Sequence, residues 1–315
     1  MSPRKGRRPT AGAMRLREWA FPAPPVRREV VRAEPDARPA PSRSQTEDGR
    51  RALGEDAPVQ RPPLLFVHGL AHAAWCWEEW LPAAADAGWS AHALSLRAHG
   101  RSEGRERFAR IRLAEYEHDV LQEASRLPRP PVVVAHSLGC VVAARVAARY
   151  PFAAVVLLAP VPVDHAADML AHVARHSPTH IARMGVGLPA QLTADDLFRG
   201  LAPTDAQRHV HRLDPEPPLV QVQLIARRPP GRPVGSPPVL VYGAEDDALV
   251  PRRATDRTAR FFGTQVRWLP DSGHDVMLDR DRARVLERVL ADLDDVLGAG
   301  RPAPAPAHDQ VRVGA

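Results

Sequence analysis

Cysteine and long apolar runs are scarce in this sequence. Cys76 and Cys140 are the only cysteines, and because each lies among apolar residues of an expected helix, we predict two reduced core thiols rather than a disulfide. The longest apolar run, residues 152–163, falls short of the roughly 20 residues that a membrane-spanning helix needs. No apolar segment of signal-peptide type follows the N-terminus. We therefore expect a cytoplasmic protein without a membrane span.

The sequence also has little net charge beyond its first 60 residues. Residues 1–60 carry five of the six net positive charges of the chain. A nucleic-acid-binding domain needs a concentration of Lys and Arg on its surface, and the nearly neutral remainder offers none. We expect the basic head to be a solvated tail and exclude nucleic acid as a partner.

Both ends of the chain lack the hydrophobic periodicity of a packed segment. Residues 1–60 are rich in Pro and Arg, and residues 298–315 in Pro and Ala. Such segments bury too little apolar surface to offset chain entropy, so we predict that both are disordered. A short strand within residues 16–21 or 26–31 is the alternative for the head. Residues 61–297 are predicted to form the folded domain.

Between these ends, short apolar runs typical of buried strands alternate with stretches of helical period. Strands are expected at residues 64–67, 91–96, 132–135, 152–158, 239–242 and 265–269, and helices at 75–87, 113–127, 140–150, 252–262 and 279–297. This alternation predicts an α/β fold with a mostly parallel sheet flanked by helices. Residues 161–232 have no convincing strand, and we expect them to form a short helical cap inserted after the strand that ends near Leu158.

One stretch, Ala135-His136-Ser137-Leu138-Gly139, joins a buried strand to a helix. A tight strand-to-helix turn leaves little room for side chains, and Ala135 and Gly139 meet that need. Such a turn lifts the Ser137 hydroxyl clear of both elements, as in a nucleophile elbow. A serine that merely begins a helix is the alternative, but the strand before it and the helix after it favour the elbow.

A serine hydroxyl is a poor nucleophile unless a base takes its proton and an acid orients that base. When the serine comes first in the chain, the acid and then the histidine are expected after later strands. Asp246 and Asp247 follow the strand at 239–242, and His274 follows the strand at 265–269. A single Asp or His in a loop is usually only a turn residue. An acid and a histidine that follow two strands in the expected order would occur by chance much less often.

Together these motifs resemble those of the α/β-hydrolase superfamily, specifically its esterase- and lipase-like members with a short helical cap. The resemblance runs from about Leu64 to Leu297 and is carried by His68-Gly69-Leu70, Ala135 to Gly139, Gly243 to Pro251, and Gly273-His274. Ala135 replaces the first glycine of the usual elbow, a small-for-small change. The serine at the nucleophile position argues against the dehalogenase and epoxide-hydrolase branches, which use aspartate.

The resemblance implies a role for each of these residues. Ser137 would be the nucleophile, His274 the general base and acid, and the backbone N–H groups of Leu70 and Leu138 the oxyanion hole. It implies no cofactor and no metal.

The orienting acid is open between two neighbours. Asp246 has the spacing from Gly243 that members of the family often show, whereas Asp247 has their spacing to Pro251. We favour Asp247, because the spacing to the proline sets the turn that aims the carboxylate at His274.

The activity implied is that of a serine hydrolase cleaving a carboxylic ester of a small to medium apolar acyl group through an acyl-enzyme, with a small-molecule ester as substrate. A thioesterase, lactonase, acyltransferase or hydroxynitrile-lyase-like enzyme could use the same site. A non-catalytic ligand-binding protein on the same scaffold is the alternative of another class, since a fold does not determine a function.

Two patterns in the cap invite a functional interpretation. Asp168, His172, His176 and His180 recur every four residues, but Pro178 would break the helix before His180, so we favour a solvated polar face over a metal site. Apolar cap residues are expected either to line an acyl pocket or to pack the cap on the core. They are Met169, Leu170, Met184, Leu188, Leu192, Leu197 and Phe198.

Overall fold

The computed structural model describes residues 26–35, 61–185, 188, 191–226 and 228–298. The predicted disorder of the head and tail therefore lies mostly outside the described residues. Within them, no helix is both long enough and apolar enough to cross a membrane. Cys76 and Cys140 are both buried and neither forms a disulfide, which confirms the prediction of two free thiols.

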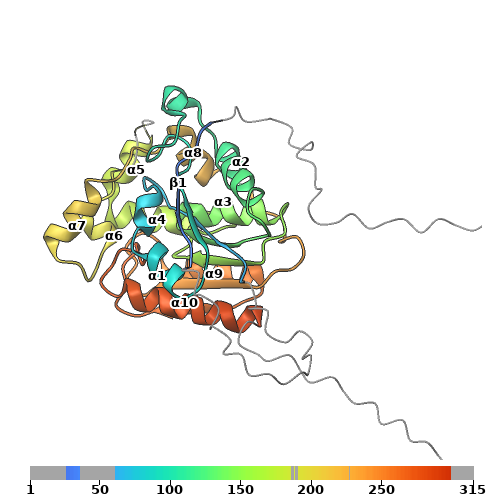
Figure 1. Ribbon diagram of the computed structural model, residues 1–315. Helices are drawn as coiled ribbons and strands as arrows, with labels where there is room; N and C mark the ends of the chain where they lie inside the picture. The colour runs from blue at the N-terminus through green and yellow to red at the C-terminus, as the bar shows by residue number, and fades with distance from the viewer. Residues whose placement is uncertain (1–25, 36–60, 186–187, 189–190, 227, 299–315) are drawn as a thin grey trace, which may run out of the picture.

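In the part of the chain that the structure describes, seven strands form one sheet (Figure 1). Their order is β1-β3-β2-β4-β5-β6-β7. They are β1 (Val30–Ala33), β2 (Leu64–Val67), β3 (Ala91–Leu94), β4 (Val132–His136), β5 (Ala154–Leu158), β6 (Val239–Ala244) and β7 (Val266–Leu269). Every pairing is parallel except that of β1 with β3. The predicted α/β fold with a mostly parallel sheet is thus confirmed.

Strand β1 is a correction to the expected boundary of the folded domain. The prediction of disorder does not hold for residues 30–33, although the alternative strand at residues 26–31 overlaps them. Val30 pairs with Leu94 at the edge of the sheet, and the Arg28 guanidinium forms a buried ion pair with Asp119 at 3.3 Å. A half-exposed edge strand of four residues is too short to show a clear hydrophobic alternation in the sequence. It is stabilised by pairing with residues that lie elsewhere in the chain.

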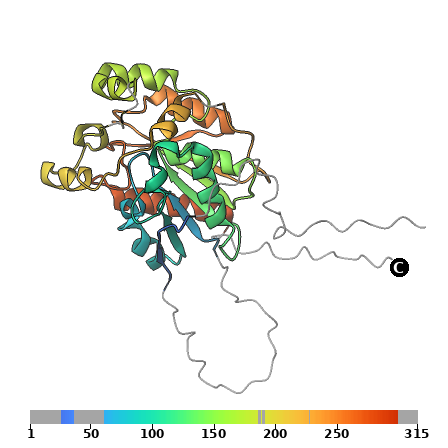
Figure 2. The same ribbon diagram turned by 90° about the horizontal axis from the view of Figure 1, so that it is seen from above.

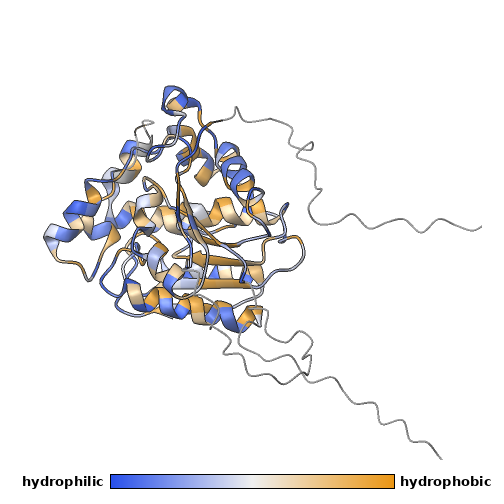
Figure 3. Ribbon diagram, viewed as in Figure 1, coloured by the Kyte–Doolittle hydropathy of each residue, from blue (hydrophilic) through white to orange (hydrophobic). Residues whose placement is uncertain are grey.

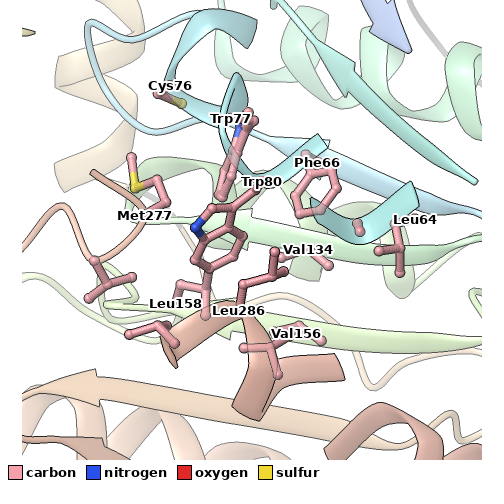
Figure 4. Packing of buried hydrophobic residues seen from close by; sticks show 14 of the residues in the cluster. Leu64, Phe66, Cys76, Trp77, Trp80, Val134, Val156, Leu158, Met277 and Leu286 are labelled. Atoms are coloured by element: carbon pink, nitrogen blue, oxygen red, sulfur yellow. The ribbon is translucent and has the colours of Figure 1, made fainter. Parts of the chain in front are cut away.

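Alternate residues of the strands face two separate hydrophobic layers. On one side, Phe66 of β2 and Val134 of β4 pack with Trp77, Trp80 and Leu286 (Figure 4). The helices of this side are η2 (Ala74–Trp77), α1 (Trp80–Asp86) and α10 (Arg282–Leu297). The Trp77 ring lies 5.0 Å from Phe66 and 5.4 Å from Trp80, centroid to centroid.

The opposite layer joins the other faces of the same strands to α2 (Leu113–Ala124), α3 (Leu138–Ala147) and α9 (Arg252–Phe262). Along α2 and α10, the hydrophobic side of each helix is turned inward and the hydrophilic side outward (Figure 3). The strands themselves are hydrophobic along most of their length. With both faces covered, only the ends of the strands remain open to a ligand.

Between β5 and β6, the described residues form five helices that group at one side of the molecule (Figure 2). They are α4 (Ala167–His176), α5 (Pro178–Gly185), α6 (Ala194–Leu197), α7 (Pro203–Val210) and α8 (Pro218–Ile225). Arg257 of α9 holds the start of this cap through Asp164 at 2.9 Å and through Asp168. Arg212, after α7, holds its far side through a two-pronged contact with Glu78 at 2.6 and 2.8 Å.

The histidine pattern of the cap is split between two helices. α4 ends at His176, and α5 begins at Pro178, so His180 belongs to a different helix from His172. The His172 and His176 rings lie 4.1 Å apart on α4, and Asp168 is engaged by Arg257 and Arg253.

Gly139 allows α3 to start directly against the end of β2. A Cβ at this position would lie 2.5 Å from the carbonyl oxygen of His68 and 2.7 Å from that of Val67. Because both atoms belong to the backbone, we expect Gly139→Ala to lower the free energy of unfolding by roughly 1–3 kcal/mol. Urea unfolding monitored by circular dichroism would measure the change.

Gly231→Ala is the matched control, since a Cβ there would meet only the Ala148 Cβ at 3.4 Å. Its effect should stay within about 0.5 kcal/mol. Equal stability of the two variants would contradict the close approach of α3 to β2.

Candidate active site

Ser137 is the single residue between β4 and α3. Its backbone has φ +50° and ψ −116°, in the left-handed region that is strained for any residue other than glycine. The turn is held because the Ser137 N–H donates to Leu158 O at 3.0 Å, and Ser137 O accepts from the Cys140 N–H at 3.0 Å. The hydroxyl therefore stands at the carboxyl end of the central strands.

The structure brings His274 and Asp247 to this hydroxyl from two separate loops. His274 Nε2 lies 2.8 Å from Ser137 Oγ, and His274 Nδ1 lies 2.8 Å from Asp247 Oδ2. The other oxygen of Asp247 accepts the backbone N–H groups of Leu249 at 2.9 Å and Val250 at 2.8 Å. An ionised carboxylate only accepts, so the proton of His274 is assigned to Nδ1. Nε2 is left free to accept the serine proton.

The neighbouring Asp246 occupies a different position. Its residue is exposed, its backbone N–H donates to Ser272 O at 3.1 Å, and its carbonyl oxygen accepts from Arg199 Nε at 3.1 Å. Of the two candidate acids, Asp247 is therefore the one whose carboxylate reaches His274.

The environment of His274 favours its protonated form. Burial lowers the pKa of this imidazole, but the carboxylate of Asp247, with smaller contributions from Asp275 and Asp196, outweighs it, so the pKa of His274 lies above its ordinary value. The cause is a neighbouring negative charge that stabilises the imidazolium. A histidine so placed can take a proton from Ser137 and hold it during a reaction.

Two backbone N–H groups lie beside Ser137. Leu138 is the first residue of α3, so its N–H has no acceptor within the helix. Leu70 follows Gly69, where a Cβ would lie 2.7 Å from His136 Nδ1 and 3.0 Å from the Ser137 Cβ. Glycine thus lets the loop after β2 rest against the elbow. Leu70 and Leu138 line the same pocket as Ser137, where such donors can stabilise a negatively charged oxygen.

A second polar pair, which the sequence interpretation did not assign, lies next to these residues. His72 Nε2 contacts Asp275 Oδ2 at 2.9 Å, and His72 Nδ1 contacts Leu70 O at 2.8 Å. Burial raises the pKa of Asp275, but the adjacent His72, together with His136 and His274, outweighs it, so the pKa lies below its ordinary value. The only signal in the sequence was position, since Asp275 follows His274 and His72 follows the His-Gly motif.

The pocket above Ser137 is almost entirely apolar and lies between the sheet and the cap. Its cap-side lining includes Met169, Leu170, Val173, Ile181, Leu192 and Leu197. Of the apolar cap residues singled out in the sequence, Met169, Leu170, Leu192 and Leu197 thus line a pocket, and its use for an acyl group stays a prediction. Leu188 is 47% exposed, and Phe198 belongs to the buried core. The Met184 side chain lies outside what the structure describes.

In the described ranges, His136, His274 and Asp275 form the one group whose possible metal-binding atoms lie within 4.8 Å of one another. Both nitrogens of His274 are engaged, by Ser137 and Asp247. His136 Nε2 contacts His274 O at 3.0 Å. A metal ion bound through His274 would have to displace one of its two hydrogen bonds.

Known proteins share both the sequence pattern and the architecture. A sequence model described as "Alpha/beta hydrolase family" matches residues 64–288. The curated proteins contain no match.

Among solved structures, the chain is similar to a soluble variant of monoglyceride lipase from Saccharomyces cerevisiae, with 14% identity, a TM-score of 0.60, and coverage of 75% of this chain and 86% of the lipase. It is also similar to a thermophilic esterase from Thermogutta terrifontis, with 20% identity, a TM-score of 0.55, and coverage of 75% and 90%. A mutant of polyneuridine aldehyde esterase shows 17% identity, a TM-score of 0.60, and coverage of 74% and 99%. At sequence identities this low, the similarity establishes a shared fold and not a shared activity.

Proposed function

The chain belongs to the alpha/beta hydrolase family, and we propose that it is a serine hydrolase that cleaves a carboxylic ester through an acyl-enzyme. The observation that carries this proposal is a continuous pair of side-chain contacts, which we call the relay. In it, Asp247 contacts His274 and His274 contacts Ser137, both at 2.8 Å. The relay lies at the floor of an apolar pocket. Esterases and lipases among the structures of the same fold agree with it.

In the proposed reaction, Ser137 Oγ attacks the ester carbonyl carbon while His274 Nε2 takes the hydroxyl proton. Asp247 stabilises the imidazolium that forms. The oxyanion accepts the N–H groups of Leu70 and Leu138, and such donors each lower a barrier by about 3–4 kcal/mol where measured. His274 then protonates the departing alkoxide, and water, activated by the same imidazole, releases the acid.

The pocket supports a small to medium apolar acyl group as the preferred substrate. Its volume is about 90 Å³, and one water needs roughly 10–15 Å³ on the same measure. The space therefore has room for several waters and suits a small to medium acyl group. Cap residues such as Met169 and Leu192, which line it, would contact the acyl tail and exclude water from it.

Two measurements on the purified protein test the proposal. A fluorophosphonate probe is expected to label the folded wild-type protein. Hydrolysis of p-nitrophenyl esters from acetate to palmitate should show the highest kcat/KM at short to medium acyl chains, in line with the pocket volume. Absence of labelling in folded protein would reject the hydrolase and favour a ligand-binding protein. An optimum at palmitate would reject the proposed pocket size.

A further inference from the structure

The peptide group that joins Leu70 to Ala71 is held at both of its polar ends by buried side chains. Its carbonyl oxygen contacts His72 Nδ1 at 2.8 Å, and its N–H donates to Glu216 Oε2 at 2.9 Å. We propose that Glu216, together with His72, is a positioning residue that preorganises the oxyanion hole by clamping this peptide. The inference rests on the proposed function, in which the Leu70 N–H is one of the two donors.

Ala71 shows why the loop needs a clamp. Its φ is +65°, in the left-handed region that an L-residue adopts only when surrounding contacts enforce it. Besides the bond from its N–H to Glu216, its carbonyl oxygen accepts the backbone N–H of Asp214 at 2.8 Å. Both backbone polar groups of Ala71 are thus taken up by one segment of the cap, between α7 and α8.

The Glu216 side chain is fixed in this position by burial and by several polar contacts. It is 1% exposed. Its Oε1 accepts the Tyr116 hydroxyl at 2.7 Å, and its Oε2 lies 3.3 Å from His99 Nε2. Burial lowers the pKa of His99, but Glu216, with smaller contributions from the Arg97 carbonyl and Asp214, outweighs it, so the pKa lies above the ordinary value. A buried carboxylate is costly unless it is paired and fully hydrogen-bonded, and here one of its partners is the strained loop itself.

The other end of the clamp is also charged. Leu70 O can only accept, so the proton of this contact belongs to His72 Nδ1. Asp275, whose pKa is lowered, faces His72 Nε2 at 2.9 Å and also accepts. The His72 ring is therefore held between the Leu70 carbonyl and the Asp275 carboxylate, and hydrogen bonds to a charged group are about twice as strong as neutral ones.

The clamp couples the cap to the site, because Glu216 and Asp214 belong to the cap while Leu70 belongs to the loop after β2. Without Glu216, Ala71 loses the partner that holds its strained backbone, and the loop that carries the Leu70 N–H is free to relax. A displacement of about 1 Å at a reacting centre can cost roughly 100-fold in rate. The loss should fall on the transition state rather than on binding of the ester.

The test compares Glu216→Ala with Glu216→Gln. The glutamine amide oxygen can still accept the Ala71 N–H, and its nitrogen can donate to the Tyr116 hydroxyl. We expect Glu216→Ala to lower kcat for the best p-nitrophenyl ester by about 10- to 100-fold, with KM changed less than about 3-fold. Glu216→Gln should restore most of the rate. Thermal melting would verify that each variant is folded.

A second readout reports on the oxyanion hole directly. An alkyl trifluoromethyl ketone adds to a reactive serine and places its oxygen where the oxyanion would form, so its inhibition constant should rise by the same factor as kcat falls. The matched control is Glu117→Gln, which alters an equally buried carboxylate that pairs with Arg145 on α3. Its kcat and its inhibition constant should match the wild type.

The outcomes separate this inference from the proposed function. Lack of fluorophosphonate labelling in the wild type rejects the proposed function itself. Wild-type kcat and ketone affinity in folded Glu216→Ala reject the clamp alone, as does an equal loss in Glu117→Gln. Should Glu216→Ala fail to fold, Glu216→Asp decides instead, because its shorter side chain cannot reach Ala71. Full activity there would overturn the clamp.

Discussion

Replacement of Ser137 by alanine is expected to lower kcat for the preferred p-nitrophenyl ester by about 10⁶-fold, which would bring it close to the background rate. The reason is that Ser137 Oγ, which His274 Nε2 contacts at 2.8 Å, is the atom that would bond to the acyl carbon. Labelling by the fluorophosphonate should disappear in the same variant. Stopped assays at high enzyme concentration would measure the residual rate.

Ser125→Ala serves as the control for this experiment. Ser125 follows α2 and is exposed, so its loss should change neither rate nor labelling. If Ser137→Ala kept its label or more than about one per cent of the activity, another group would have to be the nucleophile, and the assignment of Ser137 would fail.

The second large effect concerns the two neighbouring acids. Asp247→Asn should lower kcat by about 10⁴-fold, because an amide opposite His274 Nδ1 favours the wrong tautomer and no longer stabilises the imidazolium. Asp246→Asn should change kcat by less than about 3-fold, since the contacts of Asp246 seen here are made by its backbone. Ester hydrolysis at pH 8 would compare them. A reversal of the two effects would contradict the relay.

The pH dependence gives an independent check on the same pair. The base must be neutral to accept the serine proton, so kcat/KM should rise with pH through the pKa of His274. Because Asp247 holds that pKa above the ordinary value of about 6.5, the midpoint of the wild-type rise should lie above 6.5. In Asp247→Asn the residual activity should rise at lower pH than in the wild type. A midpoint that stays fixed would show that another group titrates.

Much of this site follows from local patterns in the sequence. A run of four apolar residues before Ser137 and a helical period after it suffice to expect the turn between β4 and α3. Likewise, His274 could be found because it follows a strand and comes after the acid in the chain. Apart from the order of the acid and the histidine in the chain, these signals depend on residues within about ten positions, where backbone preferences and hydrophobic period operate.

The sequence favours Asp247 over Asp246, but only the three-dimensional structure shows which of the two carboxylates contacts His274. Adjacent residues in a loop point in different directions, and the spacing to Pro251 suggests which one faces inward without placing it. The structure does so through the two N–H groups of Leu249 and Val250, which orient the carboxylate of Asp247. That orientation depends on the path of the loop over the end of the sheet.

Neither strand β1 nor the buried position of Glu216 could be predicted from local sequence patterns. β1 is stabilised by pairing with β3, about 60 positions later in the chain. The partners of Glu216, namely Ala71, His99 and Tyr116, lie 100 or more positions earlier. Nothing in the neighbourhood of a lone glutamate among prolines indicates that it will be buried.

The sequence by itself therefore determined the fold class and pointed to Ser137 and His274 as the proposed nucleophile and base, because periodicity and turn chemistry are properties of short segments. The tertiary structure decided which aspartate orients His274, how far the sheet extends at its edge, and which charges hold the Leu70–Ala71 peptide. Those features arise where segments distant in the chain meet. There, burial and hydrogen-bond satisfaction act between residues whose proximity no local pattern encodes.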